Sequence, residues 1–305
     1  MSPEGSIDAD IKVDGRVLRY QVVGAPQGTP VFLMHGTPGS RIGPRPRTGV
    51  LYRLGVRLIN YDRPGYGGSD RHPGRSVAGC AADVAAIADQ LGVKTFGVVG
   101  RSGGGPHALA CAAILPDRVE RAAVLVSFAP NHADDLDWYE GMNDANQRGF
   151  TADPAEEQKL VENLRLQADR TRRSPVSLLE SLRTQISGPD VNFVNDPTIE
   201  RLLLEAYAEA TRPGPYGWID DVLALRRDWG FSLSDIQQRV RLWHGAADNV
   251  VPASHTRWLA ERIRDADLYV QTDSAHFGAM GILPSILSWL IGEPEPGRPL
   301  VGVRV

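Results

Sequence analysis

Gly100-Arg101-Ser102-Gly103-Gly104 follows directly on an apolar run at 95–99 and directly precedes a helical stretch. Strand, sharp turn and helix in that order are the context in which a Gly-x-Ser-x-Gly turn presents a nucleophilic serine. The small flanking residues allow the close backbone approach that such a turn requires. The pattern therefore predicts Ser102 as a catalytic nucleophile, provided that suitable partners occur elsewhere in the chain.

A base and an acid for this serine follow later in the chain. A serine hydroxyl is a weak nucleophile near neutral pH and needs a base, which in turn needs a group that fixes its tautomer. His276 follows a predicted strand at 267–272, and Asp248 follows another at 240–244. We predict that Asp248 orients His276, with Asp134 or Asp135 as the alternative acid.

A glycine-rich loop after the predicted strand at 31–35 supplies a further element. Acyl transfer develops negative charge on an oxygen, and two backbone N–H groups aimed at that oxygen stabilise it. We assign these donors to Gly103, which follows the serine, and to Thr37 in His35-Gly36-Thr37-Pro38-Gly39. Gly103 also opens a helix, whose N-terminus favours an anion.

These motifs together resemble the α/β-hydrolase superfamily, in its serine-hydrolase form. The matching segments are the loop at 35–39, Tyr61-Asp62-Arg63-Pro64-Gly65-Tyr66-Gly67-Gly68-Ser69, the turn at Ser102, His244-Gly245-Ala246-Ala247-Asp248 and Ala275-His276-Phe277. The first loop is most similar to those of esterases, lactonases and proline-iminopeptidase-like enzymes. The resemblance implies the α/β-hydrolase fold, the triad roles, the oxyanion loop and a structural role for Asp62.

The order of predicted elements indicates an α/β protein with a mostly parallel, open, twisted sheet flanked by helices. Residues 11–23 alternate around Asp14-Gly15, which predicts a hairpin. The apolar runs at 31–35, 57–61, 95–100, 122–127, 240–244 and 267–272 predict strands covered on both faces. Sites in such sheets lie at the carboxyl ends of the strands, where all five motifs fall.

The strand–helix alternation stops at 131–232, where helix starts follow one another. Asp153-Pro154, Ser174-Pro175 and Asp196-Pro197 each combine an N-cap residue with a proline at the first helical position. We therefore predict a core at 1–130 and 233–305 and a helical cap at 131–232. Residues 292–305 are predicted to form a tail.

The remaining polar and aromatic candidates are assigned by position. His35 is expected to brace its loop and to contact substrate, His244 to be structural, and His107 to face either core or pocket. Further substrate contacts are assigned to the cap and to the residue after His276: Trp138, Tyr139, Met142, Phe150 and Phe277. The alternative is that the cap aromatic residues join cap to core. His72, His132 and His255 are interpreted as surface residues.

Composition excludes several functional classes. A net charge of −4 without a basic block does not favour nucleic-acid or membrane partners. No residue spacing predicts a metal ion or another cofactor, and the two cysteines, Cys80 and Cys111, are not expected to form a disulfide. No apolar leader or membrane-length run is found, so a cytoplasmic location is expected. The sequence leaves monomer or homodimer open.

The prediction is a serine hydrolase that acts on a small-molecule ester or lactone through an acyl-enzyme intermediate. Related enzymes that carry aspartate at the turn, the haloalkane dehalogenases and epoxide hydrolases, are disfavoured by Ser102. A proline-iminopeptidase-like amide hydrolase, a non-hydrolytic acyltransferase or cyclase, and a small-molecule receptor remain alternatives.

Overall fold

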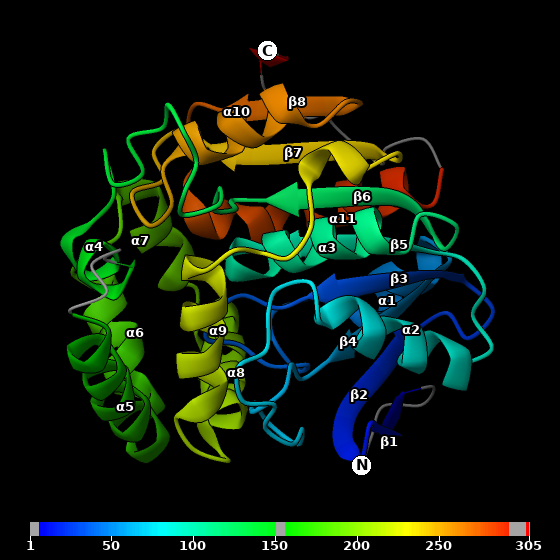
Figure 1. Cartoon of the computed structure of the whole chain (residues 1–305), viewed down its shortest axis with the longest axis horizontal. Coiled ribbons are helices and arrows are strands. Elements are labelled where there is room, and N and C mark those ends of the chain that lie inside the picture. Colours follow the sequence, from blue (N-terminus) through cyan, green and yellow to red (C-terminus); the bar gives the residue numbers. More distant parts are fainter. Residues whose placement is uncertain (1–5, 151–155, 293–302, 305) are drawn as a thin grey trace.

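The computed structural model describes residues 6–150, 156–292 and 303–304. Its centre is one sheet, with helices on both faces and a group of helices at one end (Figure 1). No helix in these ranges combines the length and the apolar character needed to cross a membrane.

The sheet begins with the expected hairpin. Strands β1 (Ile7–Val13) and β2 (Arg16–Gly24) pair antiparallel, and both residues between them have positive φ, 49° at Asp14 and 80° at Gly15. Two successive positive φ angles match the right-handed twist of a two-residue hairpin, which is why Asp-Gly predicts it.

The parallel strands follow in the order expected for a doubly wound sheet. They are β3 (Thr29–Met34), β4 (Val56–Tyr61), β5 (Phe96–Arg101), β6 (Val119–Leu125), β7 (Arg239–Gly245) and β8 (Ala266–Gln271). The spatial order is β1-β2-β4-β3-β5-β6-β7-β8-β9. The short β9 (Val303–Arg304) pairs antiparallel with β8, so the predicted tail contains one sheet strand that its composition does not indicate.

Two groups of helices cover the two faces. Helices α1 (Thr48–Arg53) and α11 (Ala279–Leu290) contribute Leu51, Leu283 and Leu287 to one cluster. Helices α2 (Cys80–Gln90), α3 (Gly105–Ile114) and α10 (Ala253–Arg262) contribute to the cluster on the other face. Apolar side chains on both faces explain the continuous apolar runs of the parallel strands.

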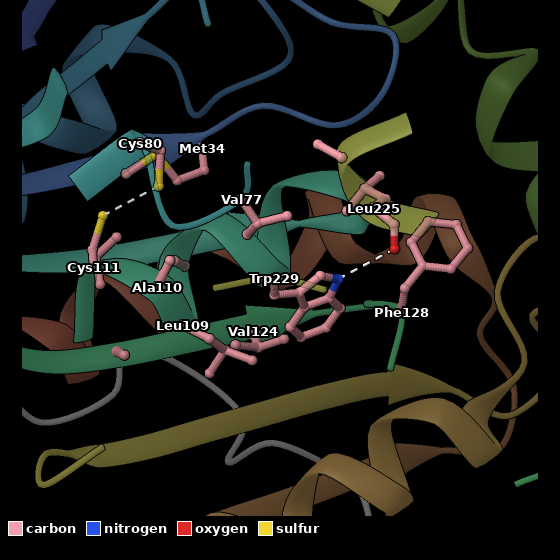
Figure 2. Packing of buried hydrophobic residues seen from close by; sticks show 14 of the residues in the cluster. Met34, Val77, Cys80, Leu109, Ala110, Cys111, Val124, Phe128, Leu225 and Trp229 are labelled. Atoms are coloured by element: carbon pink, nitrogen blue, oxygen red, sulfur yellow. Dashed lines mark hydrogen bonds between the residues drawn. The ribbon is translucent and has the colours of Figure 1, made fainter. Parts of the chain in front are cut away.

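The core between α2 and α3 contains the two cysteines (Figure 2). Cys80 and Cys111 are free thiols, both buried, with their Sγ atoms 3.9 Å apart. Trp229 packs in the same cluster and donates its indole N–H to the Leu225 carbonyl at 3.2 Å. Trp229 follows α9 (Tyr216–Arg226), which belongs to the group of helices at one end of the sheet. This cluster therefore joins that group to the sheet.

The helical group lies between β6 and β7 in sequence and beyond the carboxyl ends of the parallel strands in space (Figure 1). We call residues 131–232 the insertion. Its helices are α4 (Asp144–Phe150), α5 (Glu157–Arg173), α6 (Pro175–Arg183), α7 (Gly188–Val194), α8 (Pro197–Thr211) and α9 (Tyr216–Arg226).

Two of the three predicted helix starts lie in the described residues. The Asp196 carboxylate accepts the N–H groups of Thr198 and Ile199, the N-cap bonds that the sequence predicts. Ser174 occupies the N-cap of α6 without a side-chain cap bond. Asp153-Pro154 lies outside the described residues.

A buried carboxylate on α9 joins the insertion to the loops at the strand ends. Asp221, with no exposed surface, accepts from Arg63 Nε at 3.1 Å, from Arg75 Nη2 at 2.6 Å and from the Tyr66 hydroxyl at 3.0 Å. It also accepts from the Thr37 hydroxyl at 2.6 Å. One side chain of the insertion therefore contacts both the loop after β3 and the loop after β4.

The charges in this cluster balance locally. Burial alone would raise the pKa of Asp221, but Arg63 and Arg75 hold it well below its usual range. Burial likewise would lower the pKa of Arg63, and Asp221 raises it. Removing one member would leave buried charge uncompensated, which is more costly than losing an exposed pair.

We expect Asp221→Asn to lower the free energy of unfolding by about 3–5 kcal/mol, because two buried guanidinium groups lose their counter-charge. Urea unfolding at pH 7 measures this. The matched control is Asp220→Asn in the same helix, whose partner Arg71 is partly exposed, and which should cost about 1 kcal/mol.

The Asp221→Asn loss should be constant between pH 5 and pH 8. A carboxyl whose pKa is lowered by folding contributes stability above its unfolded pKa and loses it only as pH falls through the folded value. A loss no larger than that of Asp220→Asn would contradict this account of the cluster.

Candidate active site

The turn at Ser102 has the geometry that its flanking glycines allow. Ser102 has a φ of 55°, a left-handed conformation that is unusual for a residue with a side chain. A Cβ on Gly100 would lie 2.1 Å from the Gly104 carbonyl oxygen, and one on Gly104 would lie 2.3 Å from that of Met34. These contacts require glycine at both positions, and the turn places the serine at the end of β5.

The loop after β3 lies against this turn. A Cβ on Gly36 would stand 3.5 Å from the Ser102 Cβ and 4.0 Å from its Oγ, and one on Gly103 would stand 3.3 Å from the Thr37 nitrogen. The N–H of Thr37 donates to no backbone acceptor of the described residues. Gly103 lies in the first turn of the short 3-10 helix Ser102–Gly104, where leading N–H groups have no acceptor within the helix. Two unused backbone donors therefore lie beside the serine, as an oxyanion site requires.

His276 contacts the acid expected for it. Its Nδ1 lies 2.8 Å from Asp248 Oδ2, and both side chains are buried. Asp248 Oδ1 also accepts the N–H groups of Val250 and Val251 at 2.8 and 2.9 Å. Burial would raise the pKa of Asp248, but the charge on His276 and hydrogen bonds from His244 and His276 lower it. Asp248 thus stays ionised and fixes the imidazole with Nδ1 as donor.

The alternative acids lie elsewhere. The Asp135 carboxylate pairs with Arg262 at 2.8 Å, and the Asp134 carbonyl accepts from the indole of Trp258. Neither contacts His276. Of the three acids considered, only Asp248, which follows β7, contacts His276.

A second carboxylate, not predicted from the sequence, holds the loop of His276. Asp190 on α7 accepts the His276 N–H at 2.9 Å and the Phe277 N–H at 2.7 Å, and its own exposure is 1%. Burial raises the pKa of Asp190, while His276 lowers it. Sequence reasoning had no indication of this residue, because the contact joins positions 86 residues apart.

Ser102 and His276 line one cavity of about 530 Å³ between the strand ends and the insertion. Thr37 and His35 lie in its wall, together with Phe150 and Phe277. No hydrogen bond joins the Ser102 hydroxyl to His276 in the described part of the chain. Catalytic hydrogen bonds are often long without substrate and shorten in the reactive complex.

Histidine 35 braces the loop that carries Thr37. Its Nδ1 donates to the Gly36 carbonyl at 2.8 Å, and its Nε2 accepts the Arg63 N–H at 3.3 Å. Burial, followed by the charge on Arg63, lowers its pKa well below the usual value. The side chain is therefore neutral, in one tautomer, and lies in the cavity wall.

The other histidines are structural or exposed. His107 donates to the Gly103 carbonyl at 2.8 Å, and burial lowers its pKa to about 3. His244 contacts Val251, Thr256 and Asp248 behind His276. His72 and His132 are exposed as expected. The surface prediction for His255 is wrong: it is fully buried and accepts the Ala129 N–H at 3.2 Å.

The aromatic residues assigned to substrate binding divide into two groups. Phe150 and Phe277 line the cavity, whereas Trp138, Tyr139 and Met142 do not. The Trp138 ring stacks on Phe128 at 5.5 Å, and its N–H donates to the Ala129 and Pro130 carbonyls. We therefore correct the assignment for Trp138, Tyr139 and Met142, which pack where the insertion begins.

Among the described residues, no group of three or more His, Cys, Asp or Glu side chains is arranged to hold a metal ion.

Comparison with known proteins places this site in a family. The family model described as "alpha/beta hydrolase fold" matches residues 29–281. A pimeloyl-[acyl-carrier protein] methyl ester esterase of Chromobacterium violaceum is 32% identical over 82% of this chain and 88% of its own length. A 2-hydroxymuconate semialdehyde hydrolase of Pseudomonas putida is 27% identical over 82% of both chains.

A shorter match and a solved structure agree with this. An uncharacterized hydrolase of Bacillus subtilis, YcgS, is 33% identical over only 36% of this chain and 37% of its own length. An alpha/beta hydrolase fold protein from Nakamurella multipartita superposes with a TM-score of 0.66 at 24% identity, over 93% of this chain and 99% of that one. The predicted fold is confirmed, and the protein belongs to the alpha/beta hydrolase fold family.

Proposed function

We propose that this protein is a serine hydrolase that cleaves a small-molecule ester or lactone through an acyl-enzyme intermediate. The observation that carries the proposal is the strained turn of Ser102 in the same cavity as His276, whose Nδ1 bonds Asp248 at 2.8 Å. A nucleophile, a base and an orienting acid at one cavity are what acyl transfer requires.

In the first half-reaction His276 Nε2 takes the Ser102 proton while Oγ attacks the substrate carbonyl carbon. The carbonyl π electrons move to oxygen, and the N–H groups of Thr37 and Gly103 stabilise that oxyanion. When the oxyanion collapses, the bond to the alkoxy group breaks, and His276 gives its proton to the departing oxygen. Asp248 stabilises the transient imidazolium and keeps its orientation.

In the second half-reaction water replaces the alcohol. His276 takes a proton from water, the hydroxide oxygen attacks the acyl carbon, and the oxyanion again rests on Thr37 and Gly103. Collapse breaks the bond to Ser102 Oγ, which recovers the proton from His276. For an ester the two products are an alcohol and a carboxylic acid. For a lactone the hydroxyl and the carboxylic acid are on the same molecule.

The insertion acts as a cap in this proposal. Its helices form most of the cavity wall that faces the strand ends, and two of its carboxylates hold the reactive loops: Asp221 contacts Thr37, and Asp190 contacts the His276 backbone. Excluding water strengthens the electrostatic interactions inside the site.

The cavity argues against the amide alternative. Enzymes that recognise a substrate ammonium need carboxylates in the pocket, but no Asp or Glu among the described residues lines this one. Two acidic residues of the insertion, Glu140 and Glu156, lie outside the cavity wall. The name of the Chromobacterium violaceum relative, a methyl ester esterase, favours an oxygen ester.

Replacing Ser102 by alanine should reduce turnover of a short-chain ester by about 10⁴-fold or more, because the nucleophile is lost. Steady-state hydrolysis of a p-nitrophenyl ester panel measures this, together with fluorophosphonate labelling, which should disappear. Circular dichroism should show an unchanged fold. Ester turnover equal to wild type in Ser102→Ala would exclude the proposed nucleophile.

The same panel separates an enzyme from a receptor or a cyclase. We expect repeated turnover with release of one acid per alcohol. A single burst followed by no further turnover would favour the receptor alternative, and an acyl product on a nucleophile other than water would favour transfer.

Asp190→Asn should lower kcat at least tenfold with a smaller change in KM. The amide offers one acceptor oxygen instead of two, so one of the N–H groups of His276 and Phe277 loses its partner. The fluorophosphonate labelling rate of Ser102 should fall in parallel, since it depends on the position of the base.

The matched control is Asp196→Ala, which removes the N-cap of α8 and should cost about 1 kcal/mol of stability. Its kcat should stay within twofold of wild type. If Asp190→Asn lost no more activity than this control, Asp190 would be only structural.

A further inference from the structure

Among the described residues, the permanently charged side chains that line the cavity are of one sign. Apart from the two histidines, the described lining contains Arg101, Arg148 and Arg170 and no carboxylate. Arg148 and Arg170 are exposed near the rim, whereas Arg101 is half-buried at the end of β5. An enclosed cavity that focuses positive potential raises the local concentration of anions.

Arg101 has no hydrogen-bond or ion-pair partner in the part of the chain that the structure describes. Among the described residues, no side-chain or backbone acceptor forms a hydrogen bond or ion pair with its guanidinium, and its Nη1 is completely enclosed without an acceptor. By contrast, two buried arginines at the neighbouring strand ends, Arg63 and Arg75, share the carboxylate of Asp221. Buried polar groups are almost always satisfied, so an unpaired guanidinium in a cavity wall points to a group that arrives from outside.

Tyr207 lines the same cavity as Arg101. It comes from α8 of the insertion, so the two side chains reach the cavity wall from opposite sides of the site, one from the insertion and one from the end of β5. Burial raises the pKa of Tyr207 to about 12, so its hydroxyl remains a neutral donor at pH 7. Burial also lowers the pKa of Arg101, but an arginine stays protonated in this range because its unperturbed value is so high.

Arg101 directly precedes the proposed nucleophile in the chain. A group bound by its guanidinium would therefore lie in the same cavity as the scissile carbonyl. Such a group would be part of the substrate itself. The planar guanidinium suits a carboxylate, which it can bind through two parallel N–H donors. The Tyr207 hydroxyl would supply a third donor.

We propose that Arg101, assisted by Tyr207, binds a free carboxylate of the substrate, so that the preferred substrates are esters or lactones that also carry a carboxylate. This inference rests on the proposed serine-hydrolase function and names the class of substrate for that same site. Membership of the family does not by itself assign a carboxylate-binding role to Arg101.

The test compares monomethyl and dimethyl esters of the straight-chain dicarboxylic acids from succinic to suberic acid. Each pair differs only in whether the distal carboxylate is free or methylated. Methanol release gives kcat/KM per ester group for wild type, Arg101→Gln, Arg101→Lys and Arg172→Gln. Arg172 is exposed on α5 outside the cavity, so its variant controls for the change in net charge.

We expect wild type to favour the monomethyl ester of at least one chain length by about tenfold or more. Arg101→Gln should lower kcat/KM for that monoester about 10- to 100-fold, the range of a charge-assisted hydrogen bond, and change the dimethyl ester less than threefold. For the same monoester, kcat/KM of Arg101→Lys should lie between those of wild type and Arg101→Gln. That of Arg172→Gln should match wild type. The free dicarboxylate should inhibit wild type competitively, with a Ki at least tenfold weaker in Arg101→Gln.

Fluorophosphonate labelling of Ser102 separates the two levels of the argument. If wild type is labelled and hydrolyses dimethyl esters but favours no monoester, the carboxylate inference is wrong and the hydrolase proposal stands. If Arg101→Gln loses both esters equally, Arg101 acts on the reaction centre or the fold, and the inference is again overturned. If wild type is neither labelled nor active on any ester, the hydrolase proposal itself fails. Should Arg101→Gln not fold, the wild-type preference and the dicarboxylate inhibition decide alone.

Discussion

The buried carboxylate of Asp221 is the interaction on which the arrangement of the site depends. Two arginines, a tyrosine and the Thr37 hydroxyl converge on it from the loops after β3 and β4. Arg63 in turn donates to the carbonyls of His35 and Gly36 at 2.5 and 3.0 Å. The position of the Thr37 N–H is thus fixed by a helix that belongs to the insertion. Because a buried ion pair requires both partners, the core loops and the insertion are ordered together.

A second carboxylate extends this dependence to His276. Asp190 on α7 holds the backbone of His276 from the side of the insertion, while Asp248 holds its imidazole from the side of the sheet. The segment that forms much of the cavity wall therefore also positions His276 and the loop of Thr37. A change in the helical packing of the insertion would alter both the shape of the cavity and the position of these residues.

Placement of the aromatic residues shows where pattern and position differ. Trp138 and Phe150 both come from the first part of the insertion, yet only Phe150 lines the cavity. The buried indole of Trp138 needs an acceptor for its N–H, and the backbone carbonyls of Ala129 and Pro130, just before the insertion, accept it. The surface prediction for His255 is wrong for a related reason. Its ring nitrogens form hydrogen bonds with the Ala129 N–H and the Trp138 carbonyl, which offset the cost of burying the imidazole. Neither partner can be identified from sequence, because side-chain satisfaction depends on backbone groups far along the chain.

The sequence by itself determined the alternation of strands and helices, the hairpin at Asp14-Gly15, and the strand-end positions of Ser102, Asp248 and His276. These follow from local rules: apolar runs, turn residues with positive φ, and glycines where backbones approach closely. Only the tertiary structure decided that Asp248 rather than Asp134 contacts His276, and that Asp190 and Asp221 reach across from the insertion. It also decided that Arg101 lines the cavity with no counter-ion among the described residues. Each of these is a relation between charges that lie far apart in the chain, and local sequence carries no information about which charges the packed fold will bring within reach of each other.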